Sequence, residues 1–444
     1  MRKNQKSDST YSRSAVSLTL LIIIAALCLS LTGCYDAREP DDMGYVMAIG
    51  LDKGKTHFLK MTLQIAVPVK ISGGGGGGGS EGGGGAESST IESVETPSVW
   101  SGLNMINSFT SRQVLLSHAK AVVISEELAR NGIISYLHTM VRSKEFRPNL
   151  RVLVSRTSAE EYIKSVTPKL ELNPSKYYEL NFRSGSYTGF TPDITLNDFY
   201  FNTESLDRQS VAILASVNKF GPNKDVDIQA STYKDKNKPY PFEGDFKAGD
   251  IPRKAELKSE IMGLAVFDGA RMVGDLDGEE AAYYLMATGE YNYSYWTFPD
   301  PRHKDKFVIL DVRQNRKPKT NVSLAGGKPQ INLRLNLEGD ILSIQSGENY
   351  EKPGQIEFFE ASAENLLKEG MMRTLEKAAR QYHSDIFGFG RKAKALVLTW
   401  NQWEAMNWKG IFENSEFNVN IDLNIRRPGL IIRSVPAVSS EGKE

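Results

Sequence analysis

Cysteine is almost absent from this chain of 444 residues: it occurs only at Cys28 and Cys34, both near the amino terminus. A secreted domain that depends on disulfides would carry cysteine pairs along its body. The chain after Cys34 therefore has no disulfide, no thiol nucleophile and no cysteine metal site. Its stability has to come from packing.

An excess of charge is also absent. The 54 basic residues are balanced by 54 acidic residues, whereas nucleic-acid-binding domains usually carry a basic patch. No two histidines stand at metal-ligand spacing, and no His-Glu-x-x-His motif occurs. The five histidines are His57, His118, His138, His303 and His383. We therefore expect no nucleic-acid partner and no histidine metal site.

A membrane-spanning run is missing as well. The apolar stretch at residues 16–31 follows a basic segment and is shorter than the roughly 20 residues of a stable span, which is typical of a signal peptide. It ends Leu31-Thr32-Gly33-Cys34, which resembles the lipobox of bacterial lipoproteins. We predict cleavage between Gly33 and Cys34 and an S-diacylglyceryl group on Cys34, to which an N-acyl chain can be added. The alternative is an uncleaved helix that happens to contain a cysteine.

Two glycine-rich motifs resemble ligand sites without meeting their requirements. Residues 388–393 have the glycine spacing of a dinucleotide fingerprint, but that motif follows a strand. A predicted helix precedes them here, so a helix-ending turn fits better. The glycine run at residues 73–85 lacks the Lys-Ser or Lys-Thr pair of a phosphate loop. Glu87 follows it instead, and we predict a disordered tether at residues 72–87.

Other candidate motifs are also incomplete. Residues 184–189 differ from a nucleophile elbow because a tyrosine stands at the serine position. The acidic group Asp275, Asp277, Glu279 and Glu280 lacks the EF-hand spacing, and capping of the following helix explains it more simply. Carboxylate pairs for glycoside cleavage stay open, although no local pattern points to one. We therefore expect no catalytic residue, no metal and no cofactor.

Hydrophobic periodicity predicts strands that alternate with helices in the first half, which favours a sheet covered by helices. A capping box at Thr157 and Glu160 would begin one of these helices. The expected elements are a hairpin at 43–51 and 58–67, a helix at 97–109, a strand at 120–124, a helix at 126–142, a strand at 150–154, a helix from 157 and a strand at 211–217.

The second half is expected to contain two hairpins. Asp268-Gly269 lies between two short apolar runs, a strong hairpin signal, and Glu338-Gly339-Asp340 is expected to turn a second pair. Gly370 is a weak point in an otherwise long amphipathic helix. The expected elements are strands at 263–267 and 271–276, a helix at 281–288, alternating residues 331–337 and 341–342, a helix at 357–386 and a strand at 417–425.

These elements predict an α+β, multi-domain fold in which mixed sheets are each covered by helices on one side. The C-terminal domain can also be divided into two subdomains near residue 345. The predicted order is a lipoprotein signal peptide at 1–33, an N-terminal α/β domain at 34–217 with the tether at 72–87, a polar linker at 218–258, a C-terminal α+β domain at 259–433 and a mobile tail at 434–444.

An ordered set of sequence blocks resembles the Ger(x)C family of spore germination proteins, the C subunits of nutrient germinant receptors. Tyr35 departs from the family, which usually has tryptophan there. The blocks are residues 33–39, 48–53, 117–124, 127–129, 142–147, 263–267, 274–280 and 384–390, with Trp400, Trp408, Phe412 and residues 427–429. The resemblance covers nearly the whole chain from Cys34.

The resemblance implies a mixed α/β lipoprotein with no enzymatic activity. It implies a place on the outer face of the inner spore membrane, held by lipid on Cys34, beside two membrane-embedded partner subunits of the A and B types. The implied role is to assemble or stabilise the receptor that senses amino acids, sugars or nucleosides. Nutrient binding is assigned to the membrane subunits, so no ligand residue is carried over. Residues 142–147 and 385–390 are either contact surfaces or structural turns.

Two other classes of function are compatible with the sequence. An extracytoplasmic solute-binding lipoprotein would have two lobes around a cleft and would bind a small molecule. An extracytoplasmic hydrolase would need Ser/His/Asp groups or paired carboxylates in one pocket. We favour the receptor subunit, because the family blocks occur in order along the chain.

Overall fold

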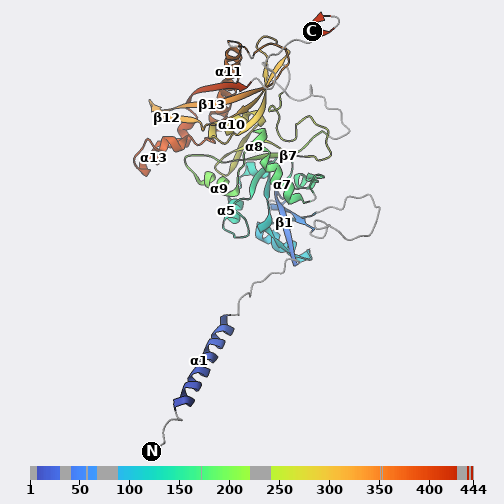
Figure 1. Cartoon of the computed structure of the whole chain (residues 1–444), viewed down its shortest axis with the longest axis vertical. Helices are drawn as coiled ribbons and strands as arrows, with labels where there is room; N and C mark the ends of the chain where they lie inside the picture. Colours follow the sequence, from blue (N-terminus) through green and yellow to red (C-terminus); the bar gives the residue numbers. More distant parts are fainter. Residues whose placement is uncertain are drawn as a thin grey trace, which may run out of the picture. The chain divides into compact units, whose positions relative to one another are not determined.

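The computed structural model describes residues 8–30, 42–56, 59–67, 89–171, 173–220, 242–350, 352, 354–427, 438–439 and 442–443. The chain divides into Met1–Met43, which holds helix α1 (Asp8–Ser30), and Gly44–Glu444, called the body below (Figure 1). Within the described ranges, no helix is long and apolar enough to cross a membrane. Gly33, Cys34 and the predicted tether lie outside the described residues, as does most of the predicted tail.

The larger sheet of the body has the strand order β3-β2-β1-β5-β6-β7-β8-β9, with β4 beside β1. Strands β1, β5, β6 and β7 are parallel, whereas antiparallel pairs lie at both ends of the sheet. The sheet is therefore mixed, and the predicted hairpins β1–β2 and β8–β9 are confirmed. The strands are β1 (Met43–Lys53), β2 (Leu59–Ala66), β3 (Ser89–Thr96), β4 (Gln113–Leu115), β5 (Ala121–Ser125), β6 (Arg151–Ser155), β7 (Val211–Val217), β8 (Ser259–Asp268) and β9 (Arg271–Leu276).

Helices cover both faces of this sheet. Along β5, Val122 and Ile124 belong to one apolar core, while Ala121 and Val123 belong to another on the opposite face. Strands buried on both faces carry near-continuous apolar runs, and this demands two helical layers. The α+β class is confirmed, but this sheet has helices on two sides rather than on one. The helices are α3 (Val99–Phe109), α5 (Ile134–Val141) and α9 (Leu196–Glu204) on one face, and α6 (Ala159–Ser165) and α7 (Pro174–Arg183) on the other.

The smaller sheet has one buried face. Leu333 and Leu335 are buried while Asn332 and Arg334 are exposed, so the predicted alternation is confirmed. The order is β10-β11-β13-β12, and β14 pairs in parallel with the other edge of β13. The strands are β10 (Tyr293–Pro299), β11 (Phe307–Arg313), β12 (Lys319–Ala325), β13 (Lys328–Ile344) and β14 (Glu416–Arg427).

Helices α10 (Gly278–Thr288) and α11 (Gln355–Glu376) pack together and join the two sheets in one apolar core. Gly370 does not interrupt α11. A Cβ atom there would lie 2.2 Å from the hydroxyl oxygen of Tyr283 on α10, so glycine permits the close approach. A π-helical turn, η4 (Lys377–Gln381), follows α11 directly. The shorter elements are η2 (Leu116–His118), α4 (Glu126–Asn131), α8 (Gly185–Thr188), α12 (Gly390–Lys394), α13 (Trp400–Met406), α14 (Trp408–Phe412), β15 (Val438–Ser439) and β16 (Gly442–Lys443).

Two carboxylates of α11 occupy the outer edge of β14. Glu364 Oε1 accepts the backbone N–H of Leu423 at 2.8 Å, and Glu360 Oε1 accepts that of Ile425 at 2.6 Å. Unpaired edge amides would otherwise offer a template for another strand. Strand β14 is therefore paired with β13 on one side and with a helix on the other.

The strands on either side of the predicted linker pair with each other. The β7–β8 ladder is antiparallel and runs from Val211 opposite Val266 to Val217 opposite Ser259. Strands β8 and β9, which the sequence assigned to the C-terminal domain, therefore lie in the larger sheet. The segment 218–258 is described only in part, and the domain boundaries stay a prediction.

Two expected helix features at residues 126–160 were wrong. The helix expected at residues 126–142 is two helices, α4 and α5. Gly132 ends the first of them with a positive φ of 101°, a backbone conformation that leaves the helix. Residues other than glycine rarely adopt it. The cap of α6 is Ser158 rather than Thr157: its hydroxyl accepts the N–H of Glu161 at 3.1 Å.

The turn expected at residues 338–340 was also wrong. Strand β13 runs through these residues, and Gly339 stays extended between Val312 and Ile425. The hairpin lies upstream, where Gly326 and Gly327 have φ values of 58° and 79° between β12 and β13. Gly-Gly supplies the two positive φ angles that a tight hairpin turn requires.

One ion-pair cluster makes stability depend on pH. Glu160 on α6 pairs with Lys164 and with Lys60 on β2, and these contacts lower its pKa to about 2 against the opposing effect of burial. Folding thus favours the charged carboxylate, which stabilises the body above pH 4.5 and loses this effect as the pH falls towards 2.

We predict that Glu160→Gln reduces the loss of unfolding free energy between pH 5 and pH 2.5. The carboxylate is partly exposed, so the difference should be about 1 kcal/mol, measured by urea unfolding at both pH values. Glu161→Gln is the control, because Glu161 is exposed and has no ion pair in the described part of the chain. Equal pH dependence in both variants would contradict the assignment.

A second prediction concerns the packing of Tyr382 against β9. A Cβ atom on Gly274 would lie 2.1 Å from the Tyr382 ring, so Gly274→Ala should destabilise the body by about 1–3 kcal/mol through overpacking. Gly44→Ala is the control, because its Cβ would meet the Ile65 methyl group at 3.3 Å. Urea midpoints compare the two, and an equally small effect of both would show that the ring moves freely.

Candidate functional site

An acidic motif lies at the start of α10, where the two sheets meet. Asp277 accepts the backbone N–H of Glu280 at 2.9 Å, and the Glu280 carboxylate accepts that of Asp277 at 3.0 Å. Asp275 lies two residues earlier on β9, and Glu279 accepts the hydroxyl of Tyr283 at 3.1 Å. The predicted cap of α10 is therefore confirmed as a reciprocal capping box.

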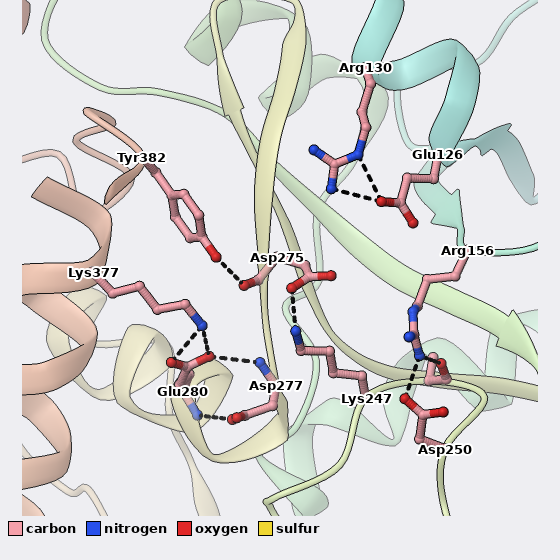
Figure 2. Close-up of polar contacts among 11 residues, drawn as sticks. Glu126, Arg130, Arg156, Lys247, Asp250, Asp275, Asp277, Glu280, Lys377 and Tyr382 are labelled. Carbon is pink, nitrogen blue, oxygen red and sulfur yellow. Dashed lines mark hydrogen bonds and ion pairs between the residues drawn. The ribbon is translucent and has the colours of Figure 1, made fainter. Parts of the chain in front are cut away.

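Two lysines from distant segments pair with two acids of this motif, Asp275 and Glu280 (Figure 2). Lys377 Nζ on η4 lies 2.8 and 2.7 Å from the two carboxylate oxygens of Glu280. Lys247, from the segment predicted as a linker, donates to Asp275, and the Tyr382 hydroxyl donates to the backbone carbonyl of Asp275 at 2.9 Å. We call this group the polar junction. Its charge-assisted hydrogen bonds hold four segments together.

Burial and charge set the protonation at the polar junction. Burial, and then the Glu280 carboxylate, raise the pKa of Asp277 well above its usual value. Burial alone would lower the pKa of Lys377, but Glu280 outweighs it, so this pKa is raised. In the part of the chain that the structure describes, no three His, Cys, Asp or Glu side chains could hold a metal ion. Ammonium groups lie where a cation would be needed.

A second junction contact lies near the end of β6 (Figure 2). The Arg156 guanidinium donates to the Asp250 carboxylate and to the backbone carbonyl of Ala248, both at 2.7 Å. Glu126 and Arg130 form an ion pair within α4 at 2.7 Å. Arg156 thus ties the segment before β8 to the larger sheet, while the α4 pair lies at the surface.

The turn at residues 385–390 binds a carboxylate of its own chain. Asp385 accepts the N–H groups of Gly388, Phe389 and Gly390 at 2.9, 3.2 and 2.8 Å, and the indole N–H of Trp408 at 2.9 Å. Burial raises the pKa of Asp385 although these four hydrogen bonds oppose it. Successive amides of this kind favour anions. Here the anion is internal, which agrees with a structural turn.

The described histidines do not form a common site. Three of them each face one glutamate, and His118 contacts the ring of Tyr45. The pairs are His138 with Glu204, His303 with Glu348, and His383 with Glu413. Residues 185–188 form the short helix α8. None of these positions shows a nucleophile and a base in contact.

A basic hollow of about 290 Å³ lies at the start of strands β5 and β6. Its charged lining consists of Lys120, Arg147, Arg151 and Arg183, together with the carboxylates Glu179 and Asp193. His118 also lines it. It therefore contains residues from the blocks 117–124 and 142–147, which the sequence singled out separately.

The sequence did not predict which residues meet at the polar junction or at the basic hollow. Lys247 and Lys377 come from segments far from Asp275 and Glu280 along the chain, and no local pattern connects them. For the basic hollow one signal existed. Lys120 and Arg151 stand at the beginning of two predicted strands, and parallel strands place their first residues at the same edge.

Comparison with known proteins identifies the family. Residues 36–217 match the family described as "Spore germination protein N-terminal domain", and residues 262–429 match "Spore germination B3/ GerAC like, C-terminal". The chain is similar to "Spore germination protein KC" of Bacillus subtilis (strain 168), with 25% identity over 422 residues, 93% of this chain and 96% of the relative. It is also similar to "Putative spore germination protein YfkR" of the same strain, with 20% identity over 411 residues, 92% of this chain and 96% of the relative.

A solved structure, "Crystal Structure of the GerBC protein", aligns with 85% of this chain and 96% of its own, with 14% identity and a TM-score of 0.49. The two matched families together span most of the chain after Cys34, in the order that the sequence blocks predict. The chain belongs to the Ger(x)C family of spore germination proteins.

Proposed function

We propose that this protein is a non-enzymatic lipoprotein subunit of a spore nutrient germinant receptor. It is needed for nutrient-triggered germination because it assembles with, or stabilises, two membrane-embedded subunits of the A and B types. The observation that carries the proposal is the match over nearly the full length of proteins named for spore germination.

A role without catalysis is supported by the way the body uses its polar groups. Asp275 and Glu280 are neutralised by lysines, and Asp385 is saturated by N–H donors. Catalytic acids and bases instead need access to a substrate proton. These groups are suited to fixing the relative positions of strands and helices, as a scaffold for partner subunits requires.

The proposed location is the outer face of the inner spore membrane. Lipid on Cys34 would attach the body there after cleavage between Gly33 and Cys34. Two acyl chains hold a protein stably at a bilayer, whereas one chain gives only marginal binding. The diacylglyceryl group on the thiol supplies two chains, and N-acylation would add a third.

The test is Cys34→Ala in sporulating cells, with membrane fractionation and a nutrient germination assay. We expect the membrane-bound fraction to fall more than about tenfold, because both acyl chains are lost, and nutrient-triggered germination to fail. Cys28→Ala is the matched control, because this cysteine lies within the apolar run, six residues before the lipobox cysteine. It should leave both readouts unchanged.

The outcomes separate anchor from function. Normal membrane retention of Cys34→Ala would show that Cys34 is not the anchor. Release into the soluble fraction with unchanged germination would keep the anchor but contradict the receptor role. Ligand screening of the soluble body would then test the solute-binding alternative.

A further inference from the structure

We propose that the basic hollow binds a phosphate-type anion, and that the anion is the headgroup phosphate of an anionic lipid in the membrane to which the chain is attached. The lipid source rests on the proposed lipid anchor at Cys34. The binding of the anion itself does not, because it depends only on side chains of the body.

The hollow carries more positive than negative charge. Four cationic side chains and two carboxylates line it. Two of the cations are already paired: Arg151 donates to both oxygens of Asp193, at 2.6 and 2.9 Å, and Arg183 donates to Glu179 at 2.8 Å. These two pairs use both of the carboxylates. The positive charge of the other two cations remains largely uncompensated.

Arg147 and Lys120 are these two cations. No carboxylate of the described residues lies within ion-pair distance of the exposed Arg147. Lys120 Nζ is 3.9 Å from Glu179, which already accepts from Arg183, so this contact is long and shared. A guanidinium and an ammonium that line one hollow can bind the oxygens of a phosphate together. The planar guanidinium of Arg147 can donate two parallel hydrogen bonds, and the ammonium of Lys120 supplies a compact positive charge.

His118 reports the positive field at the same place. Burial lowers the pKa of His118, and the positive charges of Arg147 and Lys120 lower it further. Its ring stands edge-on to Tyr45 at 4.9 Å between centroids, which fixes it at the hollow. A dianion that neutralised the two cations would remove their effect, so the imidazole would become easier to protonate.

The position of the hollow favours a lipid as the source. Strands β1, β5 and β6 are parallel, with Ala48 opposite Ala121 and Ala121 opposite Arg151. Their first residues therefore lie at the same end of the sheet, and Tyr45 of β1 contacts His118 of the hollow there. The chain enters the body at this end, only 11 residues after Cys34. Such a length spans at most about 40 Å, so the hollow lies at the end of the body that is close to the proposed anchor at Cys34.

An anionic lipid headgroup has the two properties that the hollow requires: it carries a phosphate, and it lies at the membrane surface, near which the lipid on Cys34 would hold the body. The hollow is open to solvent, with Arg147 and His118 exposed at its rim. Each Lys or Arg near an anionic membrane surface strengthens binding about fivefold. Lipid chains on Cys34 would hold the protein at the membrane, and the hollow would orient the body on it.

The first test uses inorganic phosphate and the mature chain carrying Cys34→Ala. NMR of the histidine ring protons follows all imidazoles during pH titrations with phosphate and with sodium chloride at equal ionic strength, because salt alone screens charge. Phosphate should raise the pKa of His118 more than chloride does. Arg147→Gln should abolish the extra shift, and Lys304→Gln, an exposed cation on the β10–β11 connection, should not.

The second test identifies the source with vesicles of phosphatidylglycerol or phosphatidylcholine. The Cys34→Ala chain should sediment with the anionic vesicles only, and Arg147→Gln should weaken this about fivefold, while Lys304→Gln should not. A phosphate effect without vesicle binding would overturn the lipid source and leave a site for a soluble phosphate compound. The proposal would be overturned if phosphate did not raise the pKa of His118 more than chloride does. It would also be overturned if Arg147→Gln left vesicle binding unchanged. Neither result depends on whether germination requires Cys34.

Discussion

The antiparallel ladder between β7 and β8 is the interaction on which the rest of the body depends. It joins the strands on either side of the segment predicted as a linker, so the second half of the chain begins by completing the sheet of the first half. Helix α10 follows β9 directly, and α11 packs on α10. The smaller sheet is thereby attached to the larger one through α10 and α11. The polar junction adds two ties: Lys377 links η4 to Glu280 on α10, and Lys247 links the segment before β8 to β9.

Most single elements could be predicted from the sequence, because each depends on local periodicity. The alternation along β13 and β14 and the capping of α10 were readable in this way. Errors arose where one glycine decides the backbone: Gly132 divides a helix with a positive φ, while Gly339 stays extended in a strand. Glycine is compatible with both conformations, so the tertiary packing of each segment, rather than the local sequence pattern, decides between them.

The polar contacts were less predictable than the elements. The capping box at Asp277 and Glu280 spans one helical turn and follows from spacing alone. The contact of Lys377 with Glu280, and the meeting of Lys120, Arg147 and Arg183, depend on how distant segments pack, which no short motif records. Because the total charge of the chain is zero, composition does not show that the basic hollow has surplus positive charge while the polar junction pairs its lysines with carboxylates. At the junction, the half-buried carboxylates of Asp275 and Glu280 are each paired with a lysine, whereas the surplus cations of the basic hollow lie where water can solvate them.

The carboxylates of Glu360 and Glu364 on the edge of β14 have a consequence for how this protein can associate. Many proteins bind partners by β-augmentation, in which an extended segment adds to the free edge of a sheet through backbone hydrogen bonds. At β14 the amides of Leu423 and Ile425 are already bound to α11, so an incoming strand would have to displace a helix that belongs to the common core. At β14, a binding chain would therefore have to use side-chain contacts, and strand addition to this sheet is left to the edges at β10 and β12.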